Sequence, residues 1–330
     1  MSSPHEITSS QTPPVMPATQ PAYAAPPSGA PPFASPANVP EPSERLNWRR
    51  ADIEQRFGFA GARYTDTNYH FTLLVALVLS ALILAACFYL PSLLPGGSEK
   101  QKTVLAITNK FTERGPTPYP IVFLSVWGLV ILALKKRKLV FQKKTLSIAT
   151  VPTTPDFTLT PATAPSVIAR LENLVDDCRH FILFNRIHVA LSNLRNLGQV
   201  SDVTSILRSQ ASADEDQVSS SYTLVNGFVW AVPVLGFLGT VLGLAESMGE
   251  FGATIQANGD MVKIRAALEK VIGGLSTAFD TTLLGLVGTL LLQLRATVLR
   301  RDEMRFLDDC NEYCQVNVVS KLRLQNQTQP

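Results

Sequence analysis

The amino-acid sequence predicts an all-α, polytopic membrane protein with four transmembrane helices and a helical cytoplasmic region. Only 17% of its 330 residues are charged, against about 25% in an average soluble protein. The apolar residues concentrate in four runs that are long enough, or nearly long enough, to cross a bilayer. The net charge of +3 is small and the basic residues lie beside these runs, so nucleic acid is not a predicted partner.

The first two spans are separated by Pro- and Gly-containing sequence. The first span, Phe71 to Leu90, is an uncharged run that can cross about 30 Å of hydrocarbon as a helix rising about 1.5 Å per residue. Pro91 and the Pro95–Gly97 cluster are expected to end it. The second span runs from about Tyr119 to Leu134 and is followed at once by the basic block Lys135–Lys138.

Basic clusters set the orientation, because Lys and Arg beside a span stay in the cytoplasm. The Lys135–Lys138 block places the inner end of the second span there. The third span, about Leu224 to Ala245, then runs outward, and the fourth, about Val271 to Leu294, returns. Arg295 and several later arginines follow the fourth span. Both clusters therefore predict that both termini are cytoplasmic.

The two ends of the chain and the long internal loop complete the predicted organisation. A tail rich in Pro, Ala and Ser has little to bury, which predicts disorder, and it lacks the apolar block of a signal peptide. The next segment mixes aromatic and basic residues, as expected on the inner membrane surface. The predicted domains are a disordered cytoplasmic tail (1–44), a juxtamembrane interfacial segment (45–68), the first two spans with an external loop (69–134), a cytoplasmic linker with helices (135–222), the third and fourth spans (223–295) and a cytoplasmic C-terminal helix and tail (296–330).

The cytoplasmic region between the second and third spans shows two amphipathic patterns. Apolar residues from Val167 to Ile182 repeat every three or four positions, which predicts one helix with a single apolar stripe. A second pattern runs from Ile187 to Leu197, and Gly198 is expected to end it. We expect both helices to pack on cytoplasmic extensions of the third and fourth spans. Asp202 and the acidic stretch Asp214–Asp216 are interpreted as a solvated helix face.

Small residues recur at helical spacing in the third and fourth spans. On the third they are Gly236, Gly239 and Gly243, with Thr240 beside them; on the fourth they are Ala278, Thr281 or Thr282, Gly285, and Gly288 or Thr289. Such faces allow two membrane helices to approach closely, whereas their hydroxyls can also hold water or meet a carboxyl group on an ion path. Both interpretations stay open. Pro233 is expected to kink or loosen the third helix.

Asp280 is an unusually placed charge. Only uncharged residues separate it from Arg295, over roughly 21 Å of helix, so it lies within the membrane or at its outer boundary. An intramembrane carboxylate is costly unless it faces a polar cavity, which makes Asp280 a candidate for the ion pathway. The alternative is a solvated group at the outer interface. Together with Glu246 it could form an acidic outer mouth that attracts cations.

Two segments, Val232–Leu244 and Leu275–Leu286, resemble the MotA/TolQ/ExbB proton channel family, and the resemblance covers about residues 165–310. It implies a subunit of a homo-oligomeric ring, usually a pentamer, around a dimer of a single-span partner similar to MotB, TolR or ExbD. It also implies a bacterial inner membrane, where proton flow through the ring drives rotation or other mechanical work.

The resemblance also assigns roles to individual residues. A threonine in each pore helix lines the path in that family, and by the motif these are Thr240 and Thr282, beside Thr281 and Asp280. Four spans with cytoplasmic ends resemble the motor branch, which carries a proline at the place of Pro233. The partner's membrane aspartate takes up and releases the protons.

Two departures from the family pattern stand out. Thr277 replaces the usual glutamate one turn before the pore threonine, with Asp280 nearby as a stand-in, and Leu291 stands where the TolQ and ExbB branches have a proline. Neither change removes the pore threonines. The channel helices hold no central carboxylate that could carry protons, so the carrier is expected on another chain.

The main alternative is a non-conducting oligomeric scaffold that uses the small-residue faces only for assembly. An enzyme is not predicted, because the four histidines are scattered and the sequence has neither a phosphate-binding loop nor a metal-ligand pattern. No cofactor or metal is therefore expected. The four cysteines are predicted to be reduced thiols. Sodium in place of protons stays open, and membrane lipid surrounds the predicted spans.

Overall fold

The structure is a computed structural model that describes residues 45–59, 61, 64–93, 116–152, 157–194, 199–256 and 260–323. These residues form helices joined by turns and two isolated bridges, without a strand among them. Four of the described helices are long and apolar enough to cross a membrane. The all-α, four-span prediction is thus confirmed. The predicted tail, residues 1–44, lies outside the described residues.

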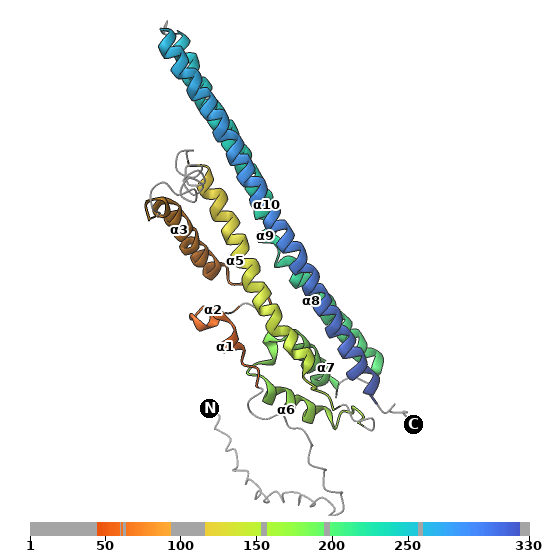
Figure 1. Ribbon diagram of the computed structural model, residues 1–330. Helices are drawn as coiled ribbons and strands as arrows, with labels where there is room; N and C mark the ends of the chain where they lie inside the picture. Colours follow the sequence, from red (N-terminus) through yellow and green to blue (C-terminus); the bar gives the residue numbers. More distant parts are fainter. Residues whose placement is uncertain are drawn as a thin grey trace, which may run out of the picture. The chain divides into compact units, whose positions relative to one another are not determined.

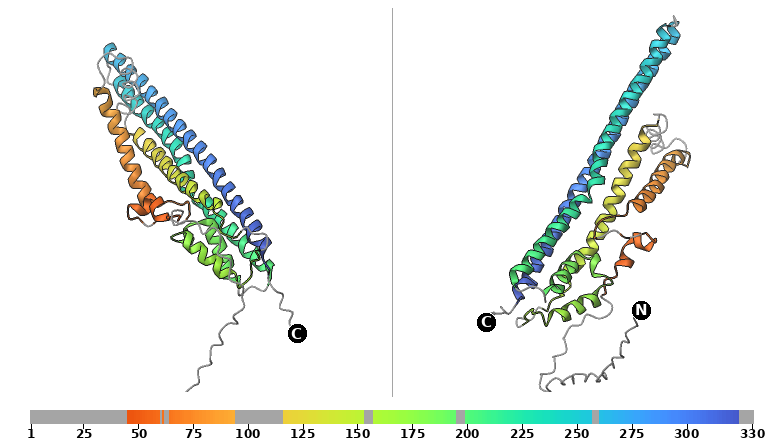
Figure 2. Two further views of the ribbon diagram at one scale, coloured as in Figure 1. Left: turned by 60° about the horizontal axis from the view of Figure 1, so that its bottom comes forward. Right: turned by 180° about the vertical axis from the view of Figure 1, so that it is seen from behind.

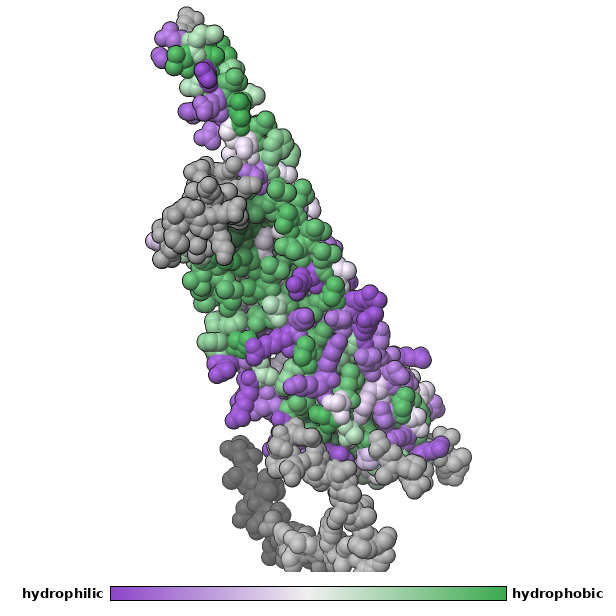
Figure 3. Space-filling view, viewed as in Figure 1, coloured by the Kyte–Doolittle hydropathy of each residue, from purple (hydrophilic) through white to green (hydrophobic). Residues whose placement is uncertain are grey.

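The four long helices pack side by side (Figures 1 and 2). α9 and α10 form an antiparallel hairpin, α5 packs against both, and α3 packs against α5. Their exposed side chains form a broad apolar band with a polar region next to it (Figure 3). The bounds are α3 Tyr69–Leu93, α5 Pro118–Lys143, α9 Thr223–Gln256 and α10 Met261–Asn317.

Shorter helices lie at the end of the bundle that carries the basic residues. They pack around the extensions of α5 and α10 and contribute many of the buried apolar residues, most densely in α7. Their bounds are α1 Trp48–Ala51, α2 Ile53–Arg56, α6 Ala164–Leu174, α7 Ile182–Ser192 and α8 Val200–Ser220, with 3-10 turns at Lys144–Ser147, Cys178–His180 and Val319–Lys321.

The first span runs past its predicted end. α3 continues through Pro91 to Leu93, so the expectation that Pro91 ends the helix is wrong. A proline in the last turn of a helix removes only one hydrogen bond, which a helix can tolerate near its end. The Pro95–Gly97 cluster lies outside the described residues.

The single helix predicted from Val167 to Ile182 is also wrong, because the chain leaves the helix at Val175. The backbone there is extended and pairs with the juxtamembrane segment, where the Leu46 N–H donates to the Leu174 carbonyl at 2.9 Å. The Asp176 carboxylate accepts the backbone N–H groups of Trp48 and Arg49 at 3.0 and 3.2 Å. These hydrogen bonds to the juxtamembrane segment take the place of the helical hydrogen bonds that the prediction expected after Leu174. Gly198 lies outside the described residues.

The acidic stretch of α8 is not wholly a solvated face. Asp214 is buried, and its carboxylate accepts a hydrogen bond from Arg186 Nε on α7 at 2.6 Å. Asp202 has a different role, because its carboxylate accepts the Gln199 N–H at 3.3 Å and caps the start of α8. The pattern of charges could not show the Arg186 pairing, because the two residues lie on different helices.

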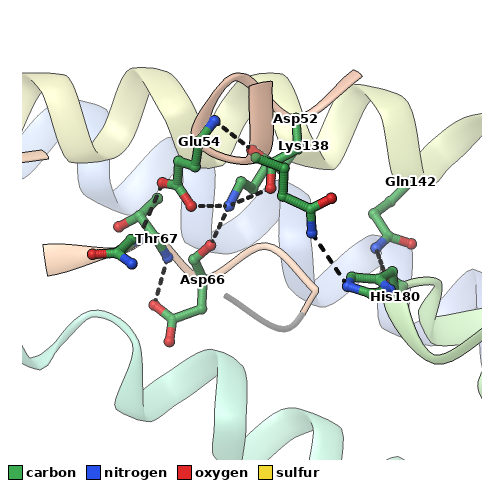
Figure 4. A network of polar contacts seen from close by, with 9 residues as sticks. Asp52, Glu54, Asp66, Thr67, Lys138, Gln142 and His180 are labelled. Atoms are coloured by element: carbon green, nitrogen blue, oxygen red, sulfur yellow. Dashed lines mark hydrogen bonds and ion pairs between the residues drawn. The ribbon is translucent and has the colours of Figure 1, made fainter. Parts of the chain in front are cut away.

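The basic block after the second span is part of the interior. Lys138 is buried, and its ammonium group donates to the Glu54 carboxylate and the Asp66 carbonyl, both at 2.7 Å, with Asp52 at 3.5 Å (Figure 4). Burial raises the pKa of Glu54, and the positive charge of Lys138 opposes that shift. These contacts fasten the juxtamembrane segment to α5.

Lys135 makes the matching contacts toward the hairpin. It is fully buried, donates to Ser221 Oγ at 2.8 Å, lies 3.3 Å from the Glu303 carboxylate and sits 4.6 Å above the centre of the Tyr222 ring. One turn of α5 therefore holds α2 on one side and α10 on the other. Lys136, between them in sequence, is exposed.

We predict that Lys135→Met destabilises the protein by about 3–5 kcal/mol, because it leaves the Glu303 carboxylate buried without its cation. Thermal unfolding of the purified protein in detergent measures this. Lys136→Met is the matched control and should leave the melting temperature almost unchanged. Adding Glu303→Leu to Lys135→Met should recover much of the loss. Equal losses from Lys135→Met and Lys136→Met would contradict an ion pair that stabilises the fold.

A second prediction concerns Cys178, whose thiol pKa is raised to about 11 by burial, with Glu172 and Asp177 adding to the shift. At pH 8 it should hold about two orders of magnitude less thiolate than an ordinary cysteine and react slowly with iodoacetamide. Peptide mass spectrometry follows the rate, which should rise steadily from pH 8 to 10. Ser205→Cys provides an exposed comparison thiol on α8. Equally fast labelling of both at pH 8 would disprove the prediction.

Candidate functional site

The backbones of α9 and α10 come close together at their glycines. A Cβ atom placed on Gly236 would lie 3.0 Å from the Thr281 carbonyl oxygen, and one on Gly285 would lie 3.1 Å from the Val232 carbonyl oxygen. Both distances are shorter than ordinary van der Waals contact. Only glycine at these positions allows this approach without a shift of the helices.

The other predicted small residues divide between two neighbours. Gly239 faces Thr281 of α10, whose Oγ1 would be 2.7 Å from an added Cβ, and Gly243 faces the backbone of Gly274. Gly288 faces α5 instead, where Ser125 Oγ would be 2.7 Å away. The small-residue stripe of the fourth span therefore packs against both α9 and α5.

Three threonine hydroxyls meet at the same level of the hairpin. Thr240 Oγ1 and Thr282 Oγ1 are 2.5 Å apart and share the carbonyl oxygens of Gly236 and Ala278 at 3.2–3.4 Å. Thr281 Oγ1 lies 3.0 Å from the Ala278 carbonyl and 3.4 Å from the Gly236 carbonyl. We refer to Thr240, Thr281 and Thr282 as the hydroxyl cluster.

The members of the hydroxyl cluster differ in exposure. Thr281 is buried between the helices at 1% exposed, whereas Thr240 and Thr282 are half-buried. The spacing of small residues left Thr281 and Thr282 as alternatives, the resemblance to the family pointed to Thr282, and the structure brings Thr282 to Thr240. An outside group can thus approach Thr240 and Thr282 but not Thr281. The cluster offers hydroxyl groups that can donate and accept hydrogen bonds between two largely apolar spans.

Pro233 lies inside α9, which continues as one helix from Thr223 to Gln256. Its Cα would be 3.5 Å from a Cβ on Gly285, so the proline turn packs directly on the glycine of α10. The kink expected at Pro233 stays a prediction.

A groove of about 580 Å³ opens toward the far end of the hairpin, between α9, α10 and the start of α5. Glu246, Ser247 and Thr277 line it, together with Glu250 and Lys270, which form an ion pair at 2.7 Å. Ser247 and the ion pair of Glu250 with Lys270 were not predicted from the sequence. Their helical spacing continues that of the small residues, and this was the one signal that could have found them.

Asp280 is half-buried on α10 and is not among the residues that line this groove. Of the two carboxylates predicted to form an acidic mouth, Glu246 lines the groove and Asp280 does not. The described residues contain no group of His, Cys, Asp and Glu side chains that could hold a metal ion.

The fold and the hydroxyl cluster define a multi-pass membrane protein whose last two spans pack through glycines around a small set of hydroxyls. Residues 182–312 match the model of the MotA/TolQ/ExbB proton channel family. The match confirms the resemblance seen in the sequence, and it covers α7 to α10 with the hydroxyl cluster inside it. No curated protein and no solved structure matches the chain.

We predict that Gly285→Val forces α9 and α10 apart and destabilises the protein by about 1–3 kcal/mol, because the added side chain meets backbone atoms that cannot turn away. Thermal unfolding in detergent measures the effect. Gly273→Val is the matched control on the same helix, since a Cβ there meets nothing within 4 Å. Unchanged stability of Gly285→Val would show that the two backbones are not in contact at this level.

Proposed function

We propose that this protein is the pore-ring subunit of a motor driven by the proton motive force in a bacterial inner membrane. Protons would cross at the interface with a single-span partner similar to MotB, TolR or ExbD, and their flow would be converted into rotation or mechanical work. The main observation that supports this proposal is the hydroxyl cluster, which lies within the residues that match the proton channel family.

The chemistry of the spans supports a partner that carries the protons. Between Leu224 and Ala245 of α9 there is no carboxylate, and between Val271 and Leu294 of α10 Asp280 is the only one. A threonine hydroxyl does not ionise near neutral pH, so Thr240 and Thr282 can pass or position a proton but cannot store it. A carboxylate on a second chain, placed against their exposed sides, would supply the missing group.

The orientation proposed for the motor has both termini in the cytoplasm. The basic block of α5 and the arginines of α10 lie at the same end of the bundle, since Lys135 pairs with Glu303 there. Basic residues beside spans favour the cytoplasmic side. On this orientation the hydroxyl cluster lies nearer the outer surface than the cytoplasm, because Thr282 is about 20 Å of helix away from Arg295.

A non-conducting oligomeric scaffold is the second candidate. The observation that favours it is that the three hydroxyls find acceptors within the hairpin, in each other and in two carbonyl groups. Satisfied hydroxyls and close glycine contacts are also what helix packing alone would require.

Purification of the tagged full-length chain from its own membrane, followed by native mass spectrometry, identifies the assembly. The motor predicts five copies with two copies of a single-span protein that carries a membrane aspartate. A ring, dimer or monomer without such a partner would favour the scaffold.

Proton uptake by liposomes holding the purified assembly then tests conduction, with a potassium gradient as driving force and a trapped pH dye. Thr240→Val with Thr282→Val should lower the flux about tenfold or more, because it removes hydrogen bonds worth roughly 1 kcal/mol or more along the path. Thr254→Val on α9 is the matched control, since that exposed hydroxyl bonds only to the Glu250 carbonyl of its own helix. Full flux through an intact double variant would refute the pore assignment.

A further inference from the structure

A pocket of about 320 Å³ lies between α1 and the cytoplasmic half of α5. It is separate from the hydroxyl cluster and from the groove at the far end of the hairpin. Its lining residues are Trp48, Ala51 and Asp52 on one side and Arg137, Lys138, Val140, Phe141 and Lys144 on the other. Cationic groups outnumber carboxylates in this lining, and Asp52 already lies 3.5 Å from Lys138.

One buried donor in the pocket lining lacks an acceptor. Trp48 is 1% exposed, and its indole N–H has no acceptor among the described residues. Its ring is held by Phe141 at 5.8 Å and Phe181 at 5.3 Å between ring centres, so it cannot easily turn toward water. A buried N–H without an acceptor is unfavourable. The nitrogen itself is buried, so an oxygen atom from a ligand in the pocket would satisfy it once the neighbouring side chains move aside.

Two exposed cations, Arg137 and Lys144, line the pocket. Arg137 lies on α5, and Lys144 begins the 3-10 turn that follows it, seven residues later in sequence and therefore on about the same face. Lys144 Nζ sits 5.6 Å above the Phe141 ring, which orders this side chain beside the pocket. A guanidinium, an ammonium and an indole N–H together form a donor set suited to phosphate oxygens.

The pocket continues the lipid-facing side of the second span. Leu129 and Ala133 are exposed on this face, followed by Arg137 and then Val140, which is 55% exposed. Arg137 lies about 4.5 Å of helix beyond Leu134, within the headgroup layer of roughly 5–7 Å that borders the hydrocarbon. Lys144 lies farther from the membrane on the cytoplasmic side, and its long side chain can extend back toward the headgroup layer.

We propose that this pocket binds the phosphate headgroup of an anionic phospholipid from the cytoplasmic leaflet. The lipid's acyl chains would continue along the apolar face of α5, and its phosphate would accept hydrogen bonds from Arg137, Lys144 and the Trp48 indole. The site uses the proposed orientation of the spans but not the conduction of protons. It would hold the juxtamembrane segment and the second span to the membrane surface.

Native mass spectrometry of the full-length protein, titrated with phosphatidylglycerol or phosphatidylcholine in detergent, tests this site. Wild type should retain phosphatidylglycerol in preference to phosphatidylcholine. Arg137→Gln with Lys144→Gln should weaken phosphatidylglycerol binding about tenfold or more, since it removes the two charged donors that would contact the phosphate. Trp48→Phe keeps most of the packing and should weaken binding by a smaller factor.

The matched control is Lys136→Gln with Lys143→Gln, which removes the same charge from exposed positions of the same helix outside the pocket lining. It should change phosphatidylglycerol binding less than about twofold, since neither lysine lines the pocket and exposed charges are screened by salt. Equal weakening by both double variants, or equal retention of both lipids, would overturn the site. Displacement of phosphatidylglycerol by millimolar inorganic phosphate would show that the pocket takes soluble phosphate and would overturn the lipid assignment. Proton flux is measured separately, so failure here leaves the proposed motor untouched.

Discussion

The close contact of α9 and α10 is the constraint on which the arrangement of the spans depends. Gly236 and Gly285 bring the two backbones so near that a Cβ at either position would press on a carbonyl oxygen of the other helix. In lipid there is little hydrophobic force between helices, so packing contacts of this kind provide most of the attraction. The same approach brings Thr240 and Thr282 within hydrogen-bond distance. The hydroxyl cluster is therefore a consequence of the glycine contact.

The end of the bundle that carries the basic residues is held by a different interaction, the burial of two lysines on one turn of α5. Lys138 joins that helix to Glu54 in the juxtamembrane segment, and Lys135 joins it to Glu303 on α10. Such pairs require a defined geometry, since a buried charge without its partner is strongly destabilising. They fix the register of α5 against both neighbours, which the apolar side chains of the spans specify less sharply.

The sequence predicted the spans and their order because hydropathy and local charge determine both. It did not predict how far α9 and α10 continue, since polar helices outside a membrane have no comparable pattern. Lys135 and Lys138 were interpreted only as topology signals. Their partners are distant in the sequence, so no local pattern could indicate the pairing. The spacing of the small residues could not choose between Thr281 and Thr282, because adjacent residues point about 100° apart on a helix and only the position of α9 decides which one meets Thr240. The resemblance to the family was what pointed to Thr282.

These features assign different tasks to the two halves of the bundle. The α9–α10 hairpin carries the hydroxyl cluster and exposes apolar side chains such as Phe237 and Leu283 on its outer faces, where neighbouring subunits, a partner helix or lipid would lie. α5 contacts this hairpin, carries the buried lysines and lines the pocket next to α1. If the hairpin experiences torque during proton flow, an anchor must resist it through contacts of fixed direction. Ion pairs and bidentate phosphate contacts have that property, whereas contacts with acyl chains allow sliding. The buried lysines of α5 and the proposed lipid site beside them would then hold the second span while the pore helices respond to protons.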